Sequence, residues 1–240
     1  MIRSLFLSTA IALSSPAMAQ DCVSVELVLL ADISSSMTMK EREIQRKGYS
    51  AAFRSGDVLD AILGSYCGSI AVQYVEFGNH PNVVADWFLI QTDEDAETFA
   101  QAIETADPIP TPDGGYLTGI ARAIRFAGGS LRDNGITAER QVVDLSADGG
   151  DNINGICSKG HVAAARDELT TPTAENGWSE VIINALPIVG GGQVVGTCGL
   201  GLSDYMDKYV RGGAGSFLME ANGVSDIPRI VRNKLAQEIG

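Results

Sequence analysis

Apolar residues along the chain fall into two alternating patterns. Short, nearly continuous apolar runs bounded by turn residues are typical of buried strands, whereas apolar residues that recur every three or four positions are typical of amphipathic helices. The first pattern predicts strands over residues 23–31, 69–77, 83–90, 141–146, 180–189 and 216–219. The second predicts helices over residues 40–55, 93–105, 158–169 and 203–210, one around 120–127, and a closing helix over 227–239 with Ser225 as its cap.

Strands that alternate with helices predict an α/β domain whose parallel sheet is covered on both faces. The strands over 69–77 and 83–90 are the exception. Only residues 78–82 join them, which is too short for a helical crossover and therefore predicts an antiparallel pair. No repeat or low-complexity linker interrupts the pattern, so we expect one domain.

The candidate chemistry lies where predicted strands end. A D-x-S-x-S motif, formed by Asp32, Ser34 and Ser36, follows the first strand directly. Asp148 follows the strand over 141–146, and Thr118 lies in a loop before a helix. Because ligands in open α/β sheets bind at the carboxyl ends of the strands, we expect these residues to converge. Carboxylate and hydroxyl oxygens suit Mg²⁺, Mn²⁺ or Ca²⁺ better than zinc or copper.

Ordinary structural roles are the alternatives for the same residues. Asp and Ser before a helix are common N-caps, which could explain the D-x-S-x-S motif and also Thr118. Asp148 precedes Gly149, and Asp-Gly pairs favour turns. Asp113 and Asp151 are further carboxylates that could support the ligands from behind.

These motifs resemble the metal-ion-dependent adhesion site (MIDAS) of von Willebrand factor type A (vWA) domains, and the chain is most similar to exported bacterial members of unassigned function. The segments 117–124 and 142–149 resemble the family's threonine loop and acidic strand end, although Ser146-Ala147-Asp148-Gly149 replaces the frequent T-D-G. The resemblance implies a doubly wound, mostly parallel central sheet with one antiparallel edge strand, which is a Rossmann-like arrangement. It also implies one divalent cation, Mg²⁺ or else Mn²⁺ or Ca²⁺, and a protein partner that supplies an acidic group. The implied metal ligands are Asp32, Ser34, Ser36, Thr118 and Asp148.

The amino terminus predicts export. Residues 1–19 have the positive start, short apolar core and Ala17-Met18-Ala19 end of a secretory signal peptide, which leaves residues 20–240 as the vWA-like domain. No cysteine lies at the cleavage point and no other long apolar run follows. We therefore expect a periplasmic or secreted protein whose mature chain does not insert into a membrane.

The mature chain contains four cysteines, an even number that favours disulfides in an exported protein. Three pairings are possible. Cys22 opens the first predicted strand and Cys67 precedes the second, so parallel strands bring them to one end of the sheet. Cys157 and Cys198 follow later strands at the opposite end. We predict the pairs Cys22–Cys67 and Cys157–Cys198.

The net charge and the absence of certain catalytic motifs narrow the classes of partner and of activity that fit the chain. The net charge of −13 disfavours nucleic acid and anionic membranes as partners. The chain has no H-E-x-x-H and no complete G-x-S-x-G motif, and Ser34 stands where an aspartyl phosphatase has its second acid. We therefore expect a binding domain and no enzyme. The alternatives are a metal-dependent hydrolase or phosphatase that uses Asp32, and a structural envelope protein with a non-functional site. The oligomeric state stays open.

Overall fold

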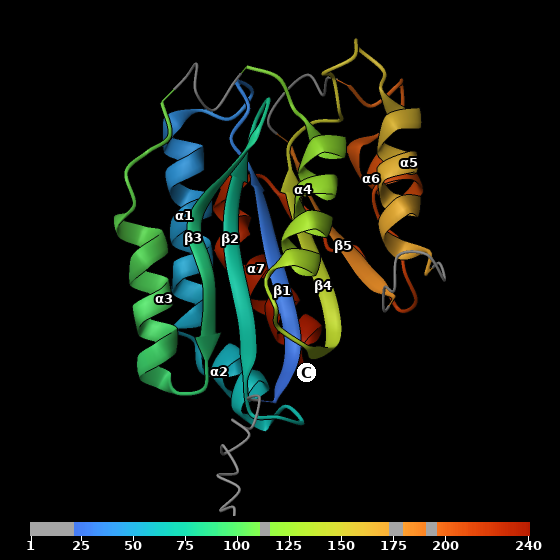
Figure 1. Cartoon of the computed structure of the whole chain (residues 1–240). Helices are drawn as coiled ribbons and strands as arrows, with labels where there is room; N and C mark the ends of the chain where they lie inside the picture. Colours follow the sequence, from blue (N-terminus) through green and yellow to red (C-terminus); the bar gives the residue numbers. More distant parts are fainter. Residues whose placement is uncertain (1–21, 111–115, 173–179, 191–195) are drawn as a thin grey trace, which may run out of the picture.

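The computed structural model describes residues 22–110, 116–172, 180–190 and 196–240. Within these residues a six-stranded sheet has the order β3-β2-β1-β4-β5-β6, and all neighbours are parallel except β2 and β3 (Figure 1). The predicted α/β fold with a mostly parallel sheet and one antiparallel edge strand is therefore confirmed. The strands are β1 (Val23–Asp32), β2 (Ile70–Phe77), β3 (Pro81–Ile90), β4 (Ala138–Ala147), β5 (Val181–Val189) and β6 (Ala221–Asn222).

Helices cover both faces of the sheet (Figure 1). Alternate residues of a strand point to opposite faces, so Leu27 and Leu29 of β1 lie in one apolar core and Val28 and Leu30 in the other. The first core is closed by α1 (Met39–Phe53), α2 (Gly56–Gly64), α3 (Asp93–Thr105) and α7 (Ile227–Ile239). The second is closed by α4 (Ile120–Asp133), α5 (Lys159–Thr170) and α6 (Leu202–Tyr209).

The register of the sheet brings strand ends together. Asp32 at the end of β1 pairs with Phe77 at the end of β2, and Ala31 pairs with Ser146 near the end of β4. The loops that follow these strands therefore begin side by side at one edge of the sheet. This edge is the one that sequence reasoning selects for the candidate site.

Both predicted disulfides are confirmed. Cys22 is bonded to Cys67 at the edge where β1 begins, and Cys157 is bonded to Cys198 at the opposite edge. Disulfides are typical of extracytoplasmic compartments. None of the described helices is long and apolar enough to cross a membrane. The predicted signal peptide lies outside the described residues.

The structure departs from the sequence predictions of local structure at three places. Helix α2 was not expected, because only Val58 and Ile62 of its side chains are buried and they form too short an apolar pattern. The predicted strand over 216–219 is reduced to a single bridge between Leu218 and Ala185, and the short edge strand β6 follows it.

The third departure concerns the start of α7. Ser225 does not cap this helix, because residues 224–226 form a turn of 3-10 helix that feeds directly into it. The capping residue is Asp226, whose side chain makes no capping hydrogen bond and instead accepts one of 2.9 Å from the Arg229 side chain. Proline in that first turn has no backbone N–H, so the start of the helix has one fewer donor for a side-chain cap to satisfy.

Candidate metal centre

The candidate centre begins at Asp32, the last residue of β1. Its side chain is fully buried, and its Oδ1 atom accepts a hydrogen bond of 2.7 Å from the Ser34 backbone N–H. Its Oδ2 atom is buried without a hydrogen-bond partner among the described residues. A buried carboxylate oxygen that lacks a partner is costly, so this atom marks a place where a cation would be stabilising.

The D-x-S-x-S motif does not cap the following helix. The N-cap of α1 is Thr38, whose hydroxyl accepts a hydrogen bond of 3.3 Å from the Glu41 N–H. Glu41 in turn accepts one of 2.7 Å from the Thr38 N–H, which completes a capping box. The capping alternative is therefore wrong for the motif, because Thr38 takes the capping role at the start of α1.

Hydroxyl groups from separate loops meet the first loop here. Ser36 donates a hydrogen bond of 2.6 Å to Asp148 Oδ1, and the Ser34 and Ser36 hydroxyls lie 3.0 Å apart. The Thr118 hydroxyl donates to Ser34 Oγ at 3.0 Å. Thr118 does not cap α4, since that helix has Gly119 as its N-cap. The structure thus brings all the predicted ligands, including Asp32, into one continuous cluster.

Other residues hold these loops in place, and sequence reasoning did not find them. The Gln45 side chain donates to the Asp32 carbonyl and Arg42 donates to the Ser34 carbonyl, both at 3.0 Å. The Thr118 N–H donates to Asn152 Oδ1 at 2.8 Å. The sequence offers one indication of these supporting contacts, because Gln45 is a polar residue on the apolar face of α1.

The remaining candidate acids have other roles. Asp151 accepts a hydrogen bond of 2.9 Å from the Ala121 N–H, so it satisfies the first turn of α4. Asp144 is fully buried in the sheet and forms an ion pair with Lys234. Asp113 lies outside the described residues.

The electrostatic environment of the centre favours a cation. Burial raises the pKa of Asp32 to about 8, and the negative charge of Asp148 adds to the shift. Burial also raises the pKa of Asp148 above its ordinary value. Both carboxyl groups are therefore destabilised as anions, and a divalent cation between them would reverse that effect.

The donor set fits a hard divalent cation. No three His, Cys, Asp or Glu side chains cluster within the described parts of the chain, so a soft or histidine-based site has no support there. The centre instead offers carboxylate and hydroxyl oxygens. Octahedral Mg²⁺ with bonds of about 2.1 Å places neighbouring ligand oxygens about 3.0 Å apart. The hydroxyl of Ser34 has this separation from the hydroxyls of both Ser36 and Thr118.

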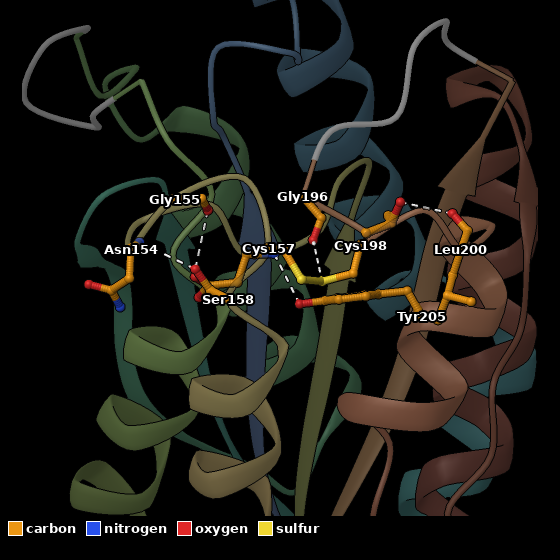
Figure 2. Close-up of a disulfide and its surroundings, with 10 residues drawn as sticks. Asn154, Gly155, Cys157, Ser158, Gly196, Cys198, Leu200 and Tyr205 are labelled. Carbon is orange, nitrogen blue, oxygen red and sulfur yellow. Dashed lines mark hydrogen bonds between the residues drawn. A yellow bond between two sulfur atoms is a disulfide. The ribbon is translucent and has the colours of Figure 1, made fainter.

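The segment after Asp148 packs closely against the loop that contains Gly196. A Cβ atom at Gly150 would lie 2.4 Å from the Gly196 carbonyl oxygen, so only glycine permits this approach. Figure 2 shows the Cys157–Cys198 disulfide beside this contact, with Tyr205 reaching toward the same segment. The Tyr205 hydroxyl accepts a hydrogen bond of 3.2 Å from the Asp151 N–H. Residues 191–195 of the loop lie outside the described residues.

Comparison with known proteins agrees with the fold. The family model described as protein of unknown function (DUF1194) matches residues 21–240. No curated protein matches the chain. Among solved structures, a von Willebrand factor type A protein from Catenulispora acidiphila has a TM-score of 0.60 at 14% identity, over 91% of this chain and 43% of that one.

Two further similar structures are those of a matrix protein and a pilus adhesin. Proximal thread matrix protein 1 from the mussel byssus, described with a zinc-occupied MIDAS motif, has a TM-score of 0.57 at 18% identity, over 90% of this chain and 48% of that one. The pilus adhesin SpaC from Lactobacillus rhamnosus GG has a TM-score of 0.57 at 13% identity, over 92% of this chain and 31% of that one. The chain thus spans less than half of each of these proteins. At such identities the likeness establishes a vWA-like fold alone.

Proposed function

The chain belongs to the DUF1194 family, and we propose that it is a binding domain that uses one divalent cation to hold an acidic group of a protein partner. The observation that carries the proposal is the buried Asp32 Oδ2 atom, which has no hydrogen-bond partner among the described residues, at the start of a loop whose Ser34 hydroxyl is bonded to the hydroxyls of Ser36 and Thr118. The adhesin and the matrix protein with a metal-occupied MIDAS motif, which share the fold, support the same function.

The proposed ligands divide into two kinds. Ser34, Ser36 and Thr118 would contribute neutral hydroxyl oxygens, and Asp32 and Asp148 would contribute carboxylates directly or through water. A bound cation supplies an electrophilic position for an incoming carboxylate. Asp32 is buried, whereas Ser36 is exposed and Asp148 is partly exposed, so the partner would approach from the side of Ser36 and Asp148. Mg²⁺, Mn²⁺ and Ca²⁺ all accept carboxylate and hydroxyl oxygens of this kind.

We further propose that the protein works in the periplasm or outside the cell after its signal peptide is removed, and that it is not an enzyme. The two disulfides support an oxidising compartment. The position two residues after Asp32 is Ser34, whose hydroxyl is engaged with the other ligand hydroxyls, and this supports binding over phosphoryl transfer.

Calorimetric titration of the metal-free mature chain with Mg²⁺, Mn²⁺ and Ca²⁺ tests the proposal. We expect binding of one ion, and loss of that binding in Asp32→Ala, which removes the buried carboxylate. Ser35→Ala is the matched control, because the Ser35 hydroxyl lies in the same loop but donates to the Tyr116 carbonyl. Absence of cation binding by the unmodified chain, or equal affinity in Asp32→Ala, would contradict the proposal.

A further inference from the structure

Large apolar side chains are exposed around the candidate metal centre. Of the seven such side chains among the described residues, four lie on or directly beside the loops that supply the predicted ligands. Met39 follows the D-x-S-x-S loop, Tyr116 and Leu117 directly precede Thr118, and Ile156 lies in the loop after Asp148. We call these four side chains the apolar rim.

The apolar rim is attached to the metal loops by direct contacts. The Tyr116 carbonyl accepts hydrogen bonds from the Ser35 N–H at 3.3 Å and from the Ser35 hydroxyl at 2.8 Å. The Leu117 N–H donates to Asn79 Oδ1 at 2.8 Å. The backbone on which these two side chains stand is therefore fixed relative to the ligand loop, although the side chains themselves face solvent.

Ile156 is held in an ordered position in a similar way. Its side chain is 82% exposed, yet it directly precedes the disulfide-bonded Cys157. The loop is also closed on itself, because Ser158 Oγ accepts a hydrogen bond from the Asn154 N–H and donates one to the Gly155 carbonyl, both at 3.3 Å (Figure 2). The Asn152 N–H at the start of this loop donates to the Thr118 carbonyl at 3.1 Å. Because the backbone of this loop is already ordered, covering Ile156 with a partner costs little entropy for ordering the loop.

We propose that the apolar rim and the cation site form one interaction surface, and that its occupant is a segment of a partner protein in which an acidic side chain is flanked by large apolar ones. This inference rests on the proposed function and names the kind of partner that the site would select. The cation would hold the carboxylate, and the rim would bury the flanking side chains. The apolar contacts matter here because the chain carries a net charge of −13, which weakens the approach of any acidic partner.

Selection from a phage-displayed library of random linear peptides on the mature chain in Mg²⁺, with elution by EDTA, tests this inference. We expect enriched peptides to share an acidic residue with a large apolar residue within a few positions. Their affinity should fall about tenfold or more in Ile156→Ala and Tyr116→Ala, since central apolar anchors dominate such interfaces. Both variants should bind Mg²⁺ like the unmodified chain, because neither side chain is a proposed ligand.

Tyr66→Ala is the matched control. Tyr66 is 88% exposed but lies beside Cys67 at the opposite edge of the sheet, so this variant should bind the peptides unchanged. Acidic peptides that are released by EDTA but show no apolar preference, or that bind the rim variants equally well, would overturn the inference and leave the proposed function standing. Failure of the chain to bind Mg²⁺ would overturn the proposed function itself.

Other occupants of the apolar rim would also be recognised. If no EDTA-sensitive peptide is enriched, the inference is wrong. Binding to phosphatidylcholine vesicles, or dimerisation in sedimentation velocity, that disappears in Ile156→Ala would then identify a membrane surface or a second copy of the chain as the occupant.

Discussion

The Thr118 hydroxyl donates a hydrogen bond of 3.0 Å to Ser34 Oγ, although 84 residues of chain separate the two residues. Thr118 is buried and precedes α4 without capping it. The contact is made between two hydroxyl groups and joins the loop before α4 to the loop after β1. Both hydroxyls can turn their lone pairs toward a cation, because a hydroxyl is donor and acceptor at once.

This contact makes Thr118 the sharpest test of the ligand set. We expect Thr118→Val to lower the affinity for Mg²⁺ about tenfold or more, since valine keeps the branched shape and removes only the oxygen. Calorimetry on the mature chain measures the affinity. Thermal unfolding in EDTA serves as the control for folding. An unchanged affinity would show that the Thr118 hydroxyl only supports the Ser34 side chain and does not contact the ion.

Cation affinity should rise with pH. Burial and the charge of Asp148 raise the pKa of Asp32 to about 8, so a proton competes with the cation below that pH. We expect Mg²⁺ affinity to increase between pH 6 and pH 8, with release of protons on binding. Titrations in buffers of different ionisation enthalpy measure the released protons. Affinity that does not vary over this range would contradict the raised pKa.

The same shift predicts how stability depends on pH without a cation. The pKa of Asp32 is raised above its ordinary value of 3.8, so folding retains a proton that the unfolded chain releases. The stability that this group contributes is therefore fully present below pH 3.8 and is lost as the pH rises toward about 8. The loss is at most about 1.4 kcal/mol per pH unit. Urea unfolding in EDTA should show this slope in the unmodified chain and a smaller one in Asp32→Asn.

The mostly parallel sheet and the convergence of the loops could be predicted because they follow from the apolar pattern and from parallel topology. β1 was placed to within one residue, and the pairing of Cys157 with Cys198 followed from the same argument. Helix α2 could not be found, since its glycine ends and short buried face resemble a loop. The sequence also identified the candidate ligands, but it did not identify the residues that hold the ligand loops in place. Asn152 and Arg42 act through backbone contacts that only the folded chain brings together.

The Cys157–Cys198 disulfide should matter for partner binding as well as for stability. It fixes the loop that presents Ile156 and the loop that contains Gly196. We expect the double variant Cys157→Ser with Cys198→Ser to weaken partner binding about tenfold or more while it lowers stability by about 2–4 kcal/mol. The double variant Cys22→Ser with Cys67→Ser is the control, because it removes a disulfide at the opposite edge. Its stability should fall similarly, with partner binding unchanged.

The enzyme alternative predicts hydrolysis of simple phosphate esters, whereas the binding proposal predicts none. We expect the mature chain with Mg²⁺ to hydrolyse no p-nitrophenyl phosphate above the rate of a buffer blank. The physical reason is that Ser34 occupies the position where a phosphatase of the aspartyl-phosphate type needs a general acid. Turnover that is reproducible and disappears in Asp32→Asn would contradict the binding proposal and favour the phosphatase.

A buried charge cluster connects α7 to the sheet beneath the site. The Lys234 ammonium lies 2.5 Å from Asp144 Oδ1 and also pairs with Glu238, and all these side chains are buried. Asn184 donates a hydrogen bond of 2.9 Å to Glu238 Oε1. Burial disfavours the charge on Lys234, but the nearby carboxylates outweigh it and raise its pKa. The sequence concealed this cluster, because Lys and Glu between apolar positions of a helix normally face solvent.

Removal of the Lys234 charge from this cluster should strongly destabilise the fold. Lys234→Met keeps the length of the side chain but leaves the Asp144 and Glu238 carboxylates buried together, and we expect a loss of about 3–5 kcal/mol in the free energy of unfolding. Arg232→Met is the control on the same helix, since Arg232 is exposed and its ion pair with Asp57 is at the surface. It should change stability by no more than about 0.5 kcal/mol.

The pH dependence of Lys234→Met separates loss of charge from loss of packing. Burial and the charge of Asp144 already raise the pKa of Glu238 to about 7, and loss of the Lys234 charge would raise it further. Below about pH 7, folded Glu238 holds its proton in both chains, so the stabilities of the two chains change alike with pH in that range. Above pH 7 the unmodified chain can ionise Glu238 beside Lys234 whereas the variant cannot, so the deficit of Lys234→Met should shrink as the pH falls from the alkaline range to about 7. Chemical unfolding at several pH values measures it, and a deficit that stays constant would mean that Lys234 stabilises α7 through packing alone.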